Sequence, residues 1–146
     1  KLVWHARVLA RLQRRLARIA APEWMLAKTA DFDHPHSVLH LDLHPMNVIM
    51  SPKGPVVIDW TNAAGGPAGF DAAVSFVEIS TFPTSSPRDG IGQRVFAQSF
   101  RRFRGGRILD PFLAAACDHR LADHGLLPDE RVAVAALRHA LAERRR

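Results

Sequence analysis

Three oxygen-bearing side chains lie close together in the sequence beside short apolar segments. Asp42 follows His40 by two residues, Asn47 comes five residues later, and Asp59 ends the apolar run at residues 56–58. A carboxylate can accept the proton of an attacking hydroxyl, and amide and carboxylate oxygens are the ligands that magnesium prefers. We therefore predict that Asp42 is a catalytic base and that Asn47 and Asp59 hold Mg²⁺ and, through it, ATP. This is the minimal equipment for moving a phosphoryl group from ATP to an alcohol.

The elements that must position these side chains are short. The sequence predicts strands at residues 37–41, 47–50 and 55–60, with a turn rich in Ser, Pro and Gly between the last two. In an antiparallel hairpin the start of one strand lies beside the end of its partner. We therefore expect Asn47 and Asp59 to lie close together.

The rest of the chain has the periodicity and capping signals of helices. We expect irregular structure in the glycine-rich segment 63–69 and helices at residues 2–19, 71–79, 92–103, 110–124 and from residue 128 onward. The predicted fold class is α+β and mainly α, as a single domain over residues 1–146 with one small hairpin.

Composition excludes several classes of partner. The 20 basic and 14 acidic residues give a net charge of +6, but the arginine-rich segments are not interleaved with the aromatic residues that a single-strand binding surface uses for stacking. We expect solvated helix faces and no nucleic-acid partner. Cys117, the single cysteine, lies in an apolar stretch and is expected to be a buried thiol in a reducing compartment. No apolar run approaches the roughly 20 residues of a membrane span, so we expect a cytoplasmic protein without a membrane partner.

The motif resembles that of a known enzyme family. The run His-Leu-Asp-Leu-His-Pro-Met-Asn at residues 40–47, together with Val-Ile-Asp-Trp at residues 57–60, resembles the catalytic and metal-binding loops of the aminoglycoside phosphotransferase and choline-kinase-like enzymes. The likeness extends through residues 66–73. It implies a protein-kinase-like C-terminal lobe and an ATP-dependent transfer of the γ-phosphoryl group to a hydroxyl of a small molecule.

The resemblance also assigns residues that support the catalytic loop, and it shows where this sequence differs from the family pattern. An Asp twelve residues after the metal ligand hydrogen-bonds to the catalytic loop in this family, and Asp71 stands at that distance from Asp59. The counterpart of His40 is mainly structural, so we expect a buried histidine there. Leu41 and Met46 replace glycines that are frequent in the loop, and we expect these changes to alter loop packing and substrate shape.

Nothing ahead of His40 resembles the ATP-clamping part of such an enzyme. A complete enzyme needs a glycine-rich loop and a lysine on a mostly β N-terminal lobe, whereas the 39 preceding residues read as one helix and a loop. We expect this lobe to be absent from the chain, to belong to the parent protein, and the isolated fragment to be weakly active or inactive.

Two alternatives remain open. The chain could be a non-catalytic kinase-like binding module, although a scaffold has no chemical need for the three oxygen-bearing side chains. It could also be a zinc-dependent hydrolase, because imidazole and carboxylate groups recur at His34, His36, His40, Asp42 and His44. The role of His44 is left open between substrate contact and a structural hydrogen bond. The acceptor is not identified, but the helices after Phe76 carry few carboxylates, which argues mildly against a polycationic antibiotic.

Overall fold

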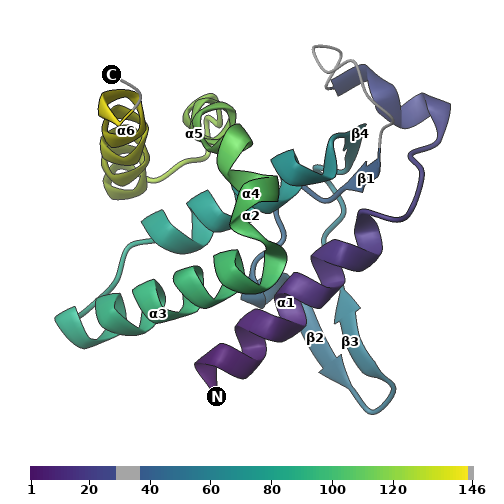
Figure 1. The fold of residues 1–146 in the computed structure, drawn as a ribbon, viewed down its shortest axis with the longest axis horizontal. Coiled ribbons are helices and arrows are strands. Elements are labelled where there is room, and N and C mark those ends of the chain that lie inside the picture. Colours follow the sequence, from purple (N-terminus) through teal and green to yellow (C-terminus); the bar gives the residue numbers. More distant parts are fainter. Residues whose placement is uncertain (29–36, 145–146) are drawn as a thin grey trace.

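The computed structural model describes residues 1–28 and 37–144, without the side chains of residues 26–28. The fold is mainly helical with small antiparallel strand pairs, as expected (Figure 1). The helices are α1 (Leu2–Leu16), α2 (Ala68–Thr81), α3 (Pro87–Arg104), α4 (Gly106–Leu109), α5 (Leu113–Leu121) and α6 (Pro128–Glu143). The strands are β1 (Ser37–Leu39), β2 (Val48–Ser51), β3 (Gly54–Val57) and β4 (Ala64–Gly66), and short 3-10 turns lie at Glu23–Lys28, Pro45–Asn47 and Asp110–Phe112.

Helix α2 is the centre of the core. It is buried along most of its length and packs against α1, α3, α5 and α6 (Figure 1). Gly69 in its first turn permits a close approach, because a Cβ there would lie 2.4 Å from the carbonyl oxygen of Ile108 and 2.5 Å from the ring of Phe112. Any side chain at this position would push α2 away from the segment that leads into α5.

Helix α1 packs one apolar face on the core and presents arginines to solvent. Leu9, Leu12 and Leu16 are buried, whereas Arg11 and Arg15 are exposed. The predicted helix is three residues too long, because the chain turns after Leu16 and Ile19 is 50% exposed. The turn is required by pairing with β1, where the N–H of Val38 donates to the carbonyl of Ile19 over 2.9 Å.

The strands form two separate pairs. In the predicted hairpin, β2 and β3 are antiparallel with Val48 opposite Val57, so this prediction is confirmed. The segment predicted to be irregular instead contains β4, which pairs with β1 and sets Leu39 opposite Ala64. Local sequence favours a loop in this glycine-rich segment, but β1 needs a partner for its backbone groups and the buried β4 supplies it.

Other helix boundaries also differ from the prediction, and α2 spans Ala68–Thr81 rather than residues 71–79. Helix α3 begins at Pro87, five residues earlier than expected, because the Ser86 hydroxyl accepts from the N–H of Asp89 and Pro87 suits the first turn. The segment predicted as one helix from Asp110 begins as a 3-10 turn and continues as α5. Among the described helices, none is both long and apolar enough to cross a membrane.

Candidate active site

The loop of residues 40–47 joins β1 to β2, and hydrogen bonds to a buried carboxylate on α2 hold it in place. The Oδ1 atom of Asp71 accepts hydrogen bonds from the backbone N–H groups of His40 and Leu41, at 3.1 and 2.7 Å. Asp71 is almost completely buried, and this burial raises the pKa of its carboxyl against the opposing effect of the two hydrogen bonds. The family resemblance predicted that Asp71 hydrogen-bonds to the catalytic loop, and in the structure these hydrogen bonds connect the loop to α2.

Leu41 shows why a glycine suits this loop. Its φ is +61°, which is the left-handed region that side chains other than glycine rarely adopt. The side chain is nevertheless buried in the core. Burial of the leucine side chain therefore offsets the strain of the backbone. Met46, the other replaced glycine, has no positive φ and is exposed at the loop surface.

His40 joins the loop to the segment that carries Asp59. Its ring is fully buried and Nε2 lies 2.9 Å from the carbonyl oxygen of Ile58, while Trp60 packs with its ring centroid 4.7 Å away. The expectation of a buried histidine is confirmed. Because Ile58 directly precedes Asp59, the contact ties the predicted metal ligand to the catalytic loop.

Asp42 and Asn47 form the centre of the constellation. The Nδ2 atom of Asn47 donates to Oδ2 of Asp42 over 3.0 Å and to the backbone carbonyl of Asp42 over 2.8 Å. His44 lies beside them, with Nε2 at 3.6 Å from Oδ1 of Asp42 and Nδ1 accepting from the N–H of Met46 over 3.3 Å. Burial lowers the pKa of His44, which favours its neutral form. The side-chain nitrogen of Asn47 is thus engaged in hydrogen bonds, and the side-chain oxygen Oδ1 is the group left for a ligand.

The hairpin brings Asn47 and Asp59 to its open end. The N–H of Ile58 donates to the carbonyl of Asn47 over 3.1 Å, directly beyond the Val48–Val57 pair. Asp59 is exposed and has a φ of +59°, and the hydroxyl of Thr61 donates to its Oδ1. This hydrogen bond lowers the pKa of Asp59, so the carboxylate is ionised at neutral pH.

The donor set at the open end of the hairpin fits magnesium better than zinc. Magnesium is usually held by one or two protein oxygens together with substrate phosphates and water, which an amide and a carboxylate provide. Within residues 1–28 and 37–144 no three His, Cys, Asp or Glu side chains are grouped to hold a metal ion. His34 and His36 of the zinc hypothesis lie outside the described residues, and Nε2 of His40 is already engaged by a backbone carbonyl.

The profile of the phosphotransferase enzyme family (APH) matches residues 2–106, which include the whole loop, the hairpin and helix α2. The chain belongs to this family. None of the curated proteins and none of the solved structures compared with the chain matches it. The family assignment makes the protein a phosphotransferase of kinase type, in agreement with the resemblance in the catalytic loop.

A pocket of about 360 Å³ opens beside Asp42 in this phosphotransferase. Its deep wall holds a charged cluster that the sequence analysis did not identify as part of the site. Arg120 of α5 places Nη2 at 2.7 Å from Oε1 of Glu130 and Nη1 at 3.3 Å from Oε1 of Glu78. Glu78 carried one detectable signal, since it is a charged residue within the otherwise apolar sequence of a helix predicted to be buried.

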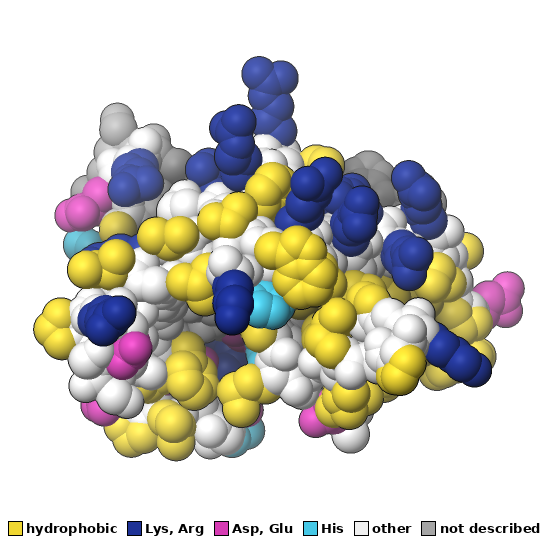
Figure 2. All heavy atoms as spheres, turned by 90° about the horizontal axis from the view of Figure 1, so that it is seen from below, with side chains coloured by type: hydrophobic (Ala, Val, Ile, Leu, Met, Phe, Trp, Pro, Cys, Tyr) yellow, Lys and Arg dark blue, Asp and Glu magenta, His cyan; other side chains and the backbone are white. Residues whose placement is uncertain are grey.

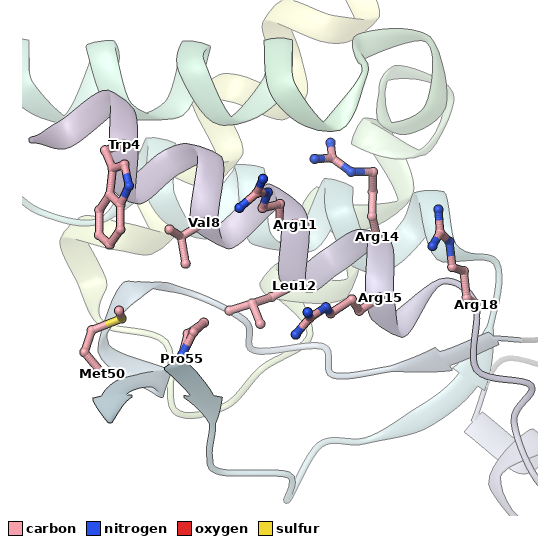
Figure 3. Close-up of a pocket in the computed structure, with 9 residues that line it drawn as sticks. All are labelled: Trp4, Val8, Arg11, Leu12, Arg14, Arg15, Arg18, Met50 and Pro55. Atoms are coloured by element: carbon pink, nitrogen blue, oxygen red, sulfur yellow. The ribbon is translucent and has the colours of Figure 1, made fainter. Parts of the chain in front are cut away.

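A second pocket, of about 410 Å³, lies between α1 and the β2–β3 hairpin. Four arginines line it, but Figure 3 shows that they do not converge: Arg15 points toward the hairpin, whereas Arg14 and Arg18 point to the opposite side of α1. Arg14 is already engaged, because its guanidinium donates to the carbonyl of Phe103. The geometry is that of a solvated basic helix face.

Proposed function

We propose that this phosphotransferase uses ATP and Mg²⁺ to transfer the γ-phosphoryl group to a hydroxyl of a small molecule, and that the described residues hold the catalytic base and the metal ligands. One observation carries the proposal: the Asn47 side chain holds the carboxylate of Asp42, while the Asn47 backbone is tied to the segment leading into Asp59. A single asparagine therefore connects the three predicted groups.

Asp42 has the surroundings that a general base needs. Asn47 donates to Oδ2, which leaves Oδ1 for a hydroxyl proton, and the side chain is 23% exposed at the wall of the pocket. A base fixed by a hydrogen bond and open to one side can accept the proton as the hydroxyl attacks phosphorus. His44 lies beside Oδ1, and its neutral form carries no positive charge that would pair with this oxygen and weaken Asp42 as a base.

Asn47 and Asp59 are the residues that would hold magnesium. When bound there, Mg²⁺ would offset the negative charge of the phosphates during transfer. The hydrogen bond from Thr61 keeps Asp59 ionised, and the hydrogen bonds from Asn47 to Asp42 orient the amide so that its carbonyl oxygen is free. The glycine-rich loop and lysine that clamp ATP are proposed to come from an N-terminal lobe of the parent protein.

The test uses the full-length protein with ATP, Mg²⁺ and a panel of hydroxylated small molecules, with phosphorylated product measured by mass spectrometry. Asp42→Asn should lower kcat about 100-fold or more, because removal of a general base costs about that much. Asp59→Ala should raise the magnesium concentration needed for activity.

Asp129→Asn is the matched control, since Asp129 is an exposed carboxylate in the first turn of α6. This substitution should change neither kcat nor the magnesium concentration needed for activity. If Asp42→Asn retains full activity, the assigned base is wrong. If no panel member is phosphorylated and a protein partner co-purifies instead, the binding-module alternative replaces this proposal.

A further inference from the structure

We propose that the acceptor of this phosphotransferase is an uncharged alcohol with a mostly apolar body, bound in the pocket beside Asp42, and that Glu78 gives this pocket one buried polar anchor. The inference rests on the proposed function, because it names the class of molecule that would present its hydroxyl to Asp42. It distinguishes that class from the cationic and polycationic alcohols that an acidic pocket would select.

Apart from its charged wall, the pocket is lined mainly by apolar side chains from several elements. These are Leu2 of α1, Met46 of the loop, Ile79 of α2, Phe82 directly after α2, and Phe96 of α3. Met46 is 76% exposed and Phe82 is 55% exposed, so the pocket rim presents hydrophobic surface that a bound apolar group would cover. The face drawn in Figure 2 is hollowed, and many of the side chains at the border of the hollow are hydrophobic.

The two buried glutamates of the pocket, unlike Asp42 at its wall, are not available to a cation. Glu78 and Glu130 are both buried, and both contact the guanidinium of Arg120, which neutralises much of their charge. Burial also raises the pKa of Glu78 well above its usual value, which favours its uncharged form. An ammonium group in this pocket would have to compete with Arg120 for Glu130, and separating that buried ion pair is costly. The charge distribution therefore favours a neutral acceptor.

Glu78 offers the polar contact that orients such an acceptor. Only 5% of its side chain is exposed, and the groups that face its carboxyl are Arg120, 3.3 Å from Oε1, and the carboxyl of Asp42. A buried carboxyl with so few hydrogen bonds is unfavourable, so a hydroxyl of a ligand that reaches it would gain a strong interaction. Glu78 also lines the pocket together with Asp42. A molecule with one hydroxyl at Asp42 and a second oxygen at Glu78 fits both groups.

Part of this pocket lies outside the segment that the family profile matches. Residues 2–106 match, whereas Arg120 and Glu130 come from α5 and α6 beyond it. The catalytic loop and Glu78 thus lie within the matched segment, whereas Arg120 and Glu130, which complete the ion pairs of the pocket, lie beyond it. This division is consistent with an acceptor specificity set by α5 and α6.

The test measures binding to the protein of residues 1–146 by calorimetry, with 4-phenyl-1-butanol, its amine analogue 4-phenylbutylamine and the polycation kanamycin as probes. The alcohol should bind at least 10-fold more tightly than either cationic probe. Phe82→Ala and Met46→Ala should each weaken binding of the alcohol about 10-fold, because about 1.4 kcal/mol of apolar contact is lost. Ile91→Ala is the matched control, since Ile91 is an exposed apolar residue of α3 that does not line the pocket.

Glu78 is tested with 4-phenylbutane-1,2-diol, which adds a second hydroxyl. The diol should bind about 5-fold more tightly than the mono-alcohol, and Glu78→Leu should remove this gain while Glu78→Gln retains it. The proposal is overturned if a cationic probe binds as tightly as the alcohol, if no probe binds, or if Phe82→Ala and Ile91→Ala have equal effects. Titration of the full-length protein with Mg²⁺ and ADP tests the proposed function separately, because alcohol binding without nucleotide binding by that protein would refute only that function.

Discussion

The backbone strain at Leu41 predicts that glycine at this position destabilises the fold less than alanine does, which is the reverse of the usual order. Replacing Leu41 by alanine removes a buried side chain, which costs about 2–5 kcal/mol, and leaves the φ of +61° in place. Replacing it by glycine removes the same side chain but also relieves the left-handed strain, which is about 1–2 kcal/mol for an L-residue. Glycine in turn costs about 0.5–1 kcal/mol through its greater freedom in the unfolded chain. The glycine variant should therefore be more stable than the alanine variant, by up to about 1.5 kcal/mol.

Leu43 is the matched control in the same loop. It is fully buried and has no positive φ, so alanine should be more stable than glycine there, by about 0.5–1 kcal/mol. The four variants at Leu41 and Leu43 are compared by urea denaturation followed by far-ultraviolet circular dichroism. The order of stability of the glycine and alanine variants should be reversed between the two positions.

A higher stability of Leu41→Ala than of Leu41→Gly would refute the reasoning. It would mean that the loop relaxes out of the left-handed conformation once the leucine side chain is gone. In that case the hydrogen bond from the Leu41 N–H to Asp71 would not hold the backbone in place, and the positioning of Asp42 would need another explanation.

Three further predictions follow from buried ionisable groups. Asp71→Ala should destabilise the fold by about 2–6 kcal/mol in urea denaturation, because two backbone N–H groups lose their acceptor, whereas Asp71→Asn, which keeps one oxygen, should cost less. Because the pKa of Glu78 is raised in the folded state, the stability that this group contributes is fully present below its ordinary value of 4.5 and is lost as pH rises through the folded value. Thermal midpoints measured across pH should show this fall in the wild type, and an equal fall in Glu78→Gln would contradict the assignment. Burial raises the pKa of the Cys117 thiol from 9.0 to about 11, so iodoacetamide at pH 8 should modify the native protein about 100-fold more slowly than the urea-unfolded chain.

The catalytic loop and hairpin were predictable because their signals are local. A turn of Ser, Pro and Gly between two apolar runs fixes the register of β2 and β3, and this register places Asn47 beside the segment that carries Asp59. The buried His40 was also predicted correctly, from the resemblance to the enzyme family. Helix α1 was predicted from its periodicity, although its end was not, because pairing with β1 overrides the local helical pattern at Ile19.

The strand β4 and the charged wall of the pocket could not be predicted in the same way. β4 forms from a glycine-rich segment only because β1 lies beside it, which is a contact between distant parts of the chain. The wall of the pocket joins Glu78, Arg120 and Glu130 from three helices, and no local pattern relates residues so far apart in the sequence.

The sequence by itself determined the identity and order of Asp42, Asn47 and Asp59, since chemical type and spacing over a single hairpin are local properties. Tertiary structure alone decided how these groups are supported and what surrounds them. Helix α2 carries Asp71 beneath the loop, and α5 and α6 bring Arg120 against two buried glutamates. The physical reason is that burial and pairing depend on which helices pack together, and packing is a property of the whole chain.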